Sequence, residues 1–202
     1  MQRPRILAGF VQGTLAGLDP ASALRVRARL APESLAVLER SSRLAWLPIE
    51  IDVELTNAIY IELGAGRAHE LFRRNLSAAL DSPILRSLAQ GALRLFGASP
   101  ERVFAWAPKA YTQIYRDSGA MRFRSEGAGV ARLELSELPP AIATSRNYLD
   151  GVAGSIAAGF DLMGVKGEVE IERFDPLGRR ACFRLDWEDD EPVEALPEPA
   201  GA

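Results

Sequence analysis

The sequence has little of the chemistry on which metal sites, disulfides and many active sites depend. Among 202 residues there is one histidine, His69, and one cysteine, Cys182. A metal centre needs several converging ligands and a disulfide needs two cysteines, so neither is predicted. No apolar run approaches the roughly 18 residues of a membrane span, and we recognise no signal peptide. A lone cysteine is typical of a reducing compartment, so we expect a cytoplasmic protein.

Strong charge of one sign is also missing from most of the chain. Residues 1–187 carry 24 basic and 21 acidic side chains, which is too small an excess to indicate nucleic-acid binding. Residues 188–202 differ, because they hold six acidic residues, three prolines and no base. We therefore expect one domain over residues 1–187 and an acidic, proline-rich, disordered tail over 188–202.

The common catalytic and nucleotide-binding motifs are absent as well. There is no Gly-x-Ser-x-Gly sequence, and a serine hydrolase would have to use the single histidine. Gly64-Ala-Gly66 follows a predicted helix instead of a strand and lacks the lysine of a phosphate loop. We therefore favour a protein that is not an enzyme. An enzyme that depends on Cys182 is a weaker third hypothesis.

What the chain does contain is a series of helix signals in its first 119 residues. Asp19-Pro20 is a good helix start, and Gly64 is a good helix stop. Residues 6–18 are compatible with a strand or an irregular helix, and residues 46–48 break the chain. Such signals predict helices over 19–30, 32–42, 49–63, 66–80, 82–96 and 99–119, the last kinked or restarted at Pro108.

After residue 119 the pattern changes to strands. Alternation around Gly127-Ala-Gly129 predicts one hairpin, and residues 165–174 and 180–187 predict a second. Between the hairpins, Pro139-Pro140 begins a helix that we extend to Gly164. The order predicts an α+β fold with helices over 1–119 and, within 120–187, an antiparallel sheet of two hairpins covered by helices.

The helix between the hairpins is unusually rich in glycine. Each interior glycine costs about 1 kcal/mol relative to alanine, so something must offset the loss. A close approach of the helix to the sheet is the simpler explanation. A ligand or a second subunit against the bare face is the functional one. The small residues of this face are Gly151, Gly154, Ser155 and Gly159.

Aromatic residues cluster on either side of Pro108. Aromatic and arginine side chains are enriched at binding hot spots, although they are equally ordinary in a core. We combine this cluster with the glycine-rich helix into one predicted pocket for a small apolar or amphipathic ligand. Its residues are Trp106, Tyr111, Tyr148, Gly151, Gly154, Ser155 and Gly159. The predicted function is a sensory or binding domain that signals through a partner or dimer surface. The alternative is a protein–protein scaffold without a ligand.

Several short motifs carry a family resemblance when taken in order. They are Trp46-Leu-Pro48, Leu63-Gly64, Leu95-Phe-Gly97, Ser99-Pro100, Trp106-x-Pro108, Tyr115-Arg-Asp-x-Gly119, Leu138-Pro139 and Trp187. Residues 5–187 thereby resemble a myxobacterial paralogous family of about 200 residues with a domain of unknown function. From about Met121, the element order is also similar to the haem–nitric-oxide-binding, vinyl-reductase-like and transport-particle-subunit fold group.

The second resemblance implies an apolar ligand cavity, often in a dimer, so we expect a homodimer. It also raises the question of haem. The haem-binding branch uses an axial histidine followed by a Tyr-x-Ser-x-Arg motif. Neither Tyr111-Thr-Gln-Ile-Tyr115 nor Ser145-Arg146-Asn147 matches that motif, and His69 precedes the expected region. We therefore predict no cofactor, and these departures count against haem.

Overall fold

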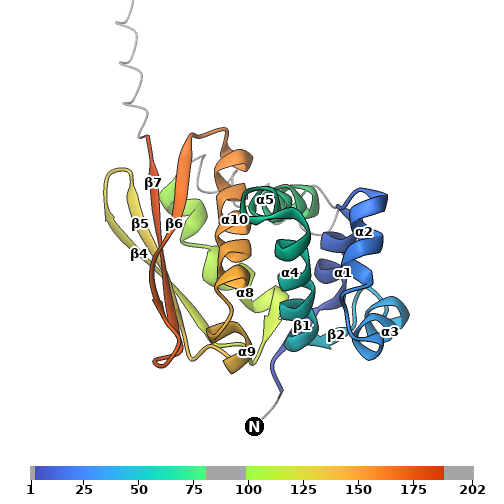
Figure 1. The fold of residues 1–202 in the computed structure, drawn as a ribbon. Helices are drawn as coiled ribbons and strands as arrows, with labels where there is room; N and C mark the ends of the chain where they lie inside the picture. Colours follow the sequence, from blue (N-terminus) through green and yellow to red (C-terminus); the bar gives the residue numbers. More distant parts are fainter. Residues whose placement is uncertain (1–2, 81–98, 189–202) are drawn as a thin grey trace, which may run out of the picture.

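The computed structural model describes residues 3–80 and 99–188 and has the predicted α+β fold. A layer of helices covers one face of a four-stranded antiparallel sheet, and a second, three-stranded sheet lies among the N-terminal elements (Figure 1). The predicted helix over 82–96 and all of the predicted tail except Glu188 lie outside the described residues.

The N-terminal helices largely follow their predicted signals. They are α1 (Ala8–Ala16), α2 (Pro20–Arg27), α3 (Pro32–Arg40), α4 (Ile49–Leu63) and α5 (Ala65–Leu80). Asp19 caps α2 by accepting a hydrogen bond from the Ser22 backbone N–H at 3.0 Å. Gly64, with φ of +76°, ends α4. Most of α4 is buried, apart from a stripe through Glu50, Glu54, Asn57 and Ile61, which makes it the central helix of this half of the molecule.

The three-stranded sheet was not predicted. Its strands are β1 (Arg5–Leu7), β2 (Trp46–Pro48) and β3 (Tyr115–Arg116), in the order β2-β1-β3. Residues 6–18, for which a strand or an irregular helix was expected, therefore begin in strand β1 and continue as helix α1. Residues 46–48 pair with β1 instead of merely breaking the chain.

The predicted helix over 99–119 is confirmed as far as Ile114, including a restart near Pro108, and is wrong over its last five residues. The structure has α7 (Pro100–Phe104) and α8 (Ala107–Ile114), and the chain then becomes extended at Tyr115. The physical reason is strand pairing, because Tyr115 lies opposite Ile6 of β1. This antiparallel ladder replaces the last helical turn that the sequence pattern predicts.

The predicted helix over 139–164 is divided into two. A short helix, α9 (Pro140–Ala143), precedes the long glycine-rich helix α10 (Arg146–Met163). Ser145 between them has an extended backbone and accepts a hydrogen bond from the Tyr148 N–H, which caps α10. Gly164, with φ of +67°, ends α10 as predicted.

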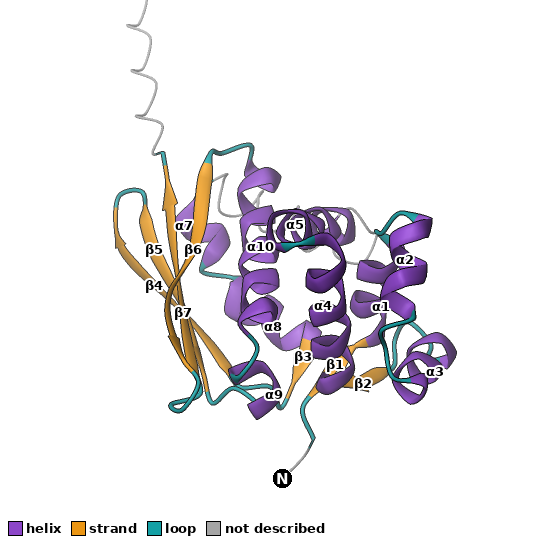
Figure 2. Cartoon of the chain, in the orientation of Figure 1, coloured by secondary structure: helices purple, strands orange, loops and turns teal. Residues whose placement is uncertain are grey.

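The two predicted hairpins form the larger sheet. Its strands are β4 (Ala120–Gly127), β5 (Val130–Ser136), β6 (Gly167–Asp175) and β7 (Arg180–Trp187), in the order β4-β5-β7-β6. In Figure 2, α10 stands between this sheet and the N-terminal helices. The core is continuous from the inner sheet face, with Leu133 and Phe183, through Phe160 of α10 to Leu55 of α4.

Candidate functional site at helix α10

The glycine face of α10, which we define as Gly151, Gly154 and Gly159, is in close contact with other helices. A Cβ atom built on Gly154 would lie 2.6 Å from the backbone oxygen of His69 on α5, a distance that real Cβ atoms do not adopt. Glycine at this position therefore lets the backbones of α10 and α5 approach each other closely.

The other two glycines face aromatic rings. A Cβ on Gly151 would lie 3.1 Å from the ring of Phe72 on α5, and one on Gly159 would lie 2.7 Å from the ring of Phe104 on α7. The close approach that offsets the cost of these glycines is thus made mainly to α5 and α7. The sequence-based explanation named the sheet as the partner, and for this face that was wrong.

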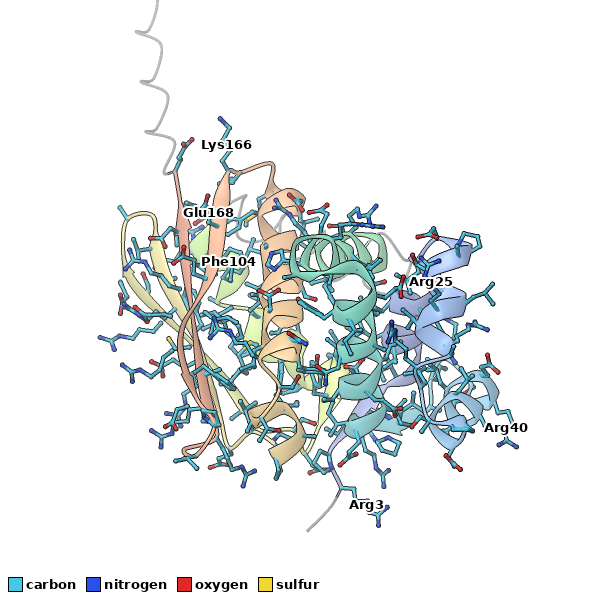
Figure 3. All side chains as sticks on the ribbon, in the orientation of Figure 1. Arg3, Arg25, Arg40, Phe104, Lys166 and Glu168 are labelled. Carbon is cyan, nitrogen blue, oxygen red and sulfur yellow. The ribbon has the colours of Figure 1, made fainter. Side chains whose placement is uncertain are left out.

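An aromatic cluster continues from the glycine face toward the sheet. The rings of Phe104 and Phe160 meet edge to face with centroids 4.8 Å apart, and the Trp187 ring lies 6.3 Å from Phe160. Gly167, at the start of β6, leaves room for the Phe160 ring, because a Cβ there would lie 2.6 Å from it. Figure 3 labels Phe104 at this junction. These aromatic contacts join α7, α10 and the sheet.

A buried polar cluster lies near the first turns of α10. The Tyr148 hydroxyl donates to Oδ2 of Asp52 on α4 at 2.6 Å and lies 3.2 Å from the Tyr115 hydroxyl. The Tyr115 ring stacks on Tyr111 of α8 with centroids 4.4 Å apart. Burial raises the pKa of Asp52 to about 6, although the hydrogen bond from Tyr148 opposes this shift. The cluster is a hydrogen-bonded connection from α10 to α4 and β3.

A second carboxylate, Asp150, lies in a more polar setting. It accepts a hydrogen bond from the Tyr60 hydroxyl at 2.5 Å, and its Oδ1 lies 3.4 Å from Nδ1 of His69. Burial acts to raise the pKa of Asp150, but hydrogen bonds from His69 and Tyr60 outweigh it and lower the pKa. The same contact with Asp150 raises the pKa of His69. The sequence analysis did not predict the pairing of His69 with Asp150, which lies 81 residues further along the chain.

The predicted pocket residues are only partly brought together. Gly151, Gly154 and Gly159 share one face of α10, and Ser155 is half-buried beside them. Tyr148 and Tyr111 are linked through Tyr115 in the polar cluster. Trp106 is half-buried, and the Lys109 ammonium lies 4.4 Å from its ring centroid.

Two surface hollows are present elsewhere on the described part of the chain, and none of the predicted pocket residues lines either of them. The first, of about 340 Å³, lies between the α1–α2 connection and the start of α5, with Leu18, Leu71 and Arg67 in its lining. The second, of about 400 Å³, lies beside the start of α10, with Asn57 and Arg146 in its lining.

Cys182 is poorly suited to catalysis. It lies on β7, largely buried, with its thiol 3.5 Å from Oε2 of Glu172. Burial and the hydrogen bond to Glu172 raise the thiol pKa to about 11. Because the thiolate is the nucleophile, this environment disfavours reactivity. Within residues 3–80 and 99–188, no three His, Cys, Asp or Glu side chains are placed to hold a metal ion.

Comparison with solved structures places this geometry in a known fold. The unliganded Fe(II) H-NOX protein from K. algicida matches over 92% of this chain and 98% of its own, with 10% identity and a TM-score of 0.64. The chain has the H-NOX fold. A variant of T. Tengcongensis H-NOX, which is 12% identical, matches over 91% and 98% of the two chains with a TM-score of 0.53.

An H-NOX structure solved to probe heme distortion matches as well, with 12% identity, coverage of 90% and 95%, and a TM-score of 0.54. The likeness therefore extends over the N-terminal helices and not only over the part after Met121. No protein-family model and no curated protein matches the sequence. Among the described helices, none has the length and apolarity needed to cross a bilayer.

The residues of this chain do not fit the haem that the H-NOX fold suggests. Proteins hold haem iron through His, Cys, Tyr or Met side chains. Nδ1 of the single histidine pairs with Asp150, which leaves Nε2 as its possible ligand atom, but none of the four side-chain types lines either hollow described above. The Cys182 thiol contacts Glu172 on the sheet. All four tyrosine hydroxyls hydrogen-bond inside the protein, to Asp150, Ser118, Tyr148 and Asp52. Met121 and Met163 pack against the core, and among residues 1–2, 81–98 and 189–202 only Met1 belongs to the four ligand types.

Proposed function

We propose that this chain is a haem-independent, non-enzymatic sensory domain that binds a small apolar or amphipathic ligand beside the glycine face of α10. The observation that carries the proposal is that a side chain, Phe104, and not backbone, closes this face at Gly159. Phe104 is the last residue of α7, a helix of only five residues. Rotation of its ring would leave an apolar site bounded by Gly159 and Phe160.

The proposed signal starts at the same ring. A ligand that takes the place of Phe104 would change the packing of α7 on α10, and Tyr148 connects α10 to Asp52 on α4. Such a ligand shifts the domain only by the difference in its affinity for the two packings. We propose that a partner or a second copy in a homodimer reads this shift. A cytoplasmic location and membership of the myxobacterial paralogous family remain predictions from the sequence.

The proposal can be tested with dodecanoate, a single-chain amphiphile, as the probe. We expect dodecanoate to raise the melting temperature of the wild-type chain. Phe104→Ala should bind it about tenfold more tightly, because no ring must be displaced, a difference of about 1.4 kcal/mol. The double variant Phe104→Ala/Gly159→Leu refills the space and should lose this gain. Equal binding by all three proteins, or no binding by any, would exclude the site.

The alternative function, a ligand-free interaction scaffold, is favoured by a different observation. The glycine face is filled by α5 and α7, and all buried side-chain nitrogen and oxygen atoms of the described residues have partners. A helix packed in this way needs no ligand to complete it. Under this alternative, dodecanoate binds neither the wild type nor Phe104→Ala with measurable affinity. A protein partner is then lost on mutation of the aromatic region around Trp106.

A further inference from the structure

The two edges of the large sheet carry opposite charges. β4 and β6 are the outer strands, and among the described residues each pairs with a neighbour on one side only. On the solvent face, β4 presents Arg122 and Arg124, and β6 presents Glu168 and Glu170, all of them exposed. Glu168 is labelled on the sheet in Figure 3. An open edge strand is a template for pairing with another strand, and its charges decide which one.

The strand directions of the sheet allow one copy to continue another. All four strands are antiparallel in the order β4-β5-β7-β6, so β4 of a second copy would lie antiparallel to β6 and preserve the alternation. Each strand has an irregularity, at Ser125/Gly127 in β4 and at Ile171/Arg173 in β6. The regular stretches that remain, residues 120–125 and 167–171, are similar in length.

One register pairs the arginines of β4 with the glutamates of β6. With Arg124 of one copy opposite Glu168 of the next, Arg122 necessarily falls opposite Glu170, because antiparallel partners move in opposite directions along the two strands. The intervening residues, Phe123 and Val169, also become partners. Both are only half-buried and both lie on the inner face of the sheet. The register therefore joins two opposite-charge pairs on one face to an apolar pair on the other.

Pairing of like edges is disfavoured by the same residues. Two β4 strands would bring arginines together, and two β6 strands would bring glutamates together, which destabilises cross-strand pairs. Arg124 has a competing contact with Glu126 on its own strand, but at 3.8 Å and with the Arg124 side chain 70% exposed it is weak. The charges thus discriminate between the possible partners of each edge.

We infer that copies of this chain associate head to tail, with β4 of one copy adding to β6 of the next in this register. Because the two surfaces differ, the contact does not close on itself as a twofold dimer does, and it leaves a free β4 and a free β6 on every assembly. The association depends on exposed ion pairs and weakens as salt is added.

Sedimentation velocity of the full-length chain over a concentration series, at low and high salt, tests this inference. The wild type should show growing assemblies at low salt. Arg122→Glu/Arg124→Glu makes both edges acidic, and Glu168→Arg/Glu170→Arg makes both basic, so each variant alone should associate about tenfold more weakly. An equimolar mixture of the two variants should regain the association, because each basic edge again finds an acidic one.

The matched control carries the same charge change away from the sheet. Arg40→Glu/Arg43→Glu alters α3 and the segment after it, and Figure 3 shows Arg40 on the side of the molecule opposite the sheet. This variant should associate like the wild type, and circular dichroism should show all variants folded. A wild type that stays monomeric, or that stops at a dimer at every concentration, would overturn the inference. So would edge variants that still associate, a mixture that does not recover, or a control that loses association.

Discussion

The two halves of α10 are held in place mainly by different kinds of contact, polar in the first half and close packing in the second. Its first two turns are held through polar groups, with Tyr148 bonded to Asp52 and Asp150 bonded to Tyr60 and His69. Its later turns are held mainly by close packing, since Gly154 touches the backbone of α5 and Gly159 touches an aromatic ring, and near their end by an exposed ion pair between Asp161 and Arg73. Polar contacts depend on pH, whereas close packing depends on volume. The two halves should therefore respond to different perturbations.

The largest expected effect comes from Asp52 in the polar half. Its pKa of about 6 in the folded chain lies above the ordinary value of 3.8. The folded state therefore binds the proton more tightly, and stability should fall as pH rises through this window. At about 1.4 kcal/mol per pKa unit, the loss approaches about 3 kcal/mol by pH 7. Urea unfolding between pH 4 and pH 7, compared with Asp52→Asn, measures it. If the free energy of unfolding changed equally with pH in the two proteins, the raised pKa of Asp52 would be refuted.

Gly154→Ala should produce the next largest effect, and in the packed half. Alanine improves helix propensity by about 1 kcal/mol, but the new methyl group meets the His69 backbone oxygen at 2.6 Å. Overpacking of this kind costs about 1–3 kcal/mol, so we expect a net loss of about 1 kcal/mol that does not vary with pH.

The matched control for this substitution is Gly66→Ala on α5. A Cβ there would meet nothing within 4 Å, so the same change should stabilise the chain by about 0.5–1 kcal/mol. Urea unfolding of both variants measures whether each substitution raises or lowers the free energy of unfolding. Stabilisation by Gly154→Ala would mean that α10 and α5 are not in backbone contact.

The smallest predicted effect concerns His69, which contacts both halves. Asp150 raises the pKa of His69 in the folded chain. The pair therefore stabilises the folded state fully when the pH is below 6.5, the pKa of histidine in the unfolded chain, and this stabilisation is lost as the pH rises through the folded pKa. Because the pair is about one-third exposed, we expect less than about 1 kcal/mol. The chain has one histidine, so proton NMR shows a single imidazole titration. Asp150→Asn should lower that pKa, and an unchanged titration would contradict the pairing.

Much of the fold could be predicted because its signals are local. The Asp19 cap, the Gly64 and Gly164 stops and the alternation in both hairpins each depend on neighbouring residues. The three-stranded sheet could not be predicted, because strands of two or three residues are too short to show alternation. Tyr115 looked helical for the same reason, since its strand partner Ile6 is more than a hundred residues away.

The site was harder to predict than the fold. The small residues of α10 correctly indicated a close approach, but composition alone does not say which surface approaches. The polar contacts of α10 join residues about 80 to 100 positions apart, such as Asp52 with Tyr148. One signal was available, because Asp52 lies on the same side of α4 as Ile49 and Thr56, three and four residues away, and an aspartate that is buried there must find a partner.

The most direct test of the account compares native and denaturing mass spectra of the full chain, expressed with ample haem, beside its absorbance spectrum. The account predicts no haem mass and no haem absorbance band, together with a small-molecule mass that is lost on denaturation. A folded protein that carries haem, and loses it in His69→Gln, would contradict the account.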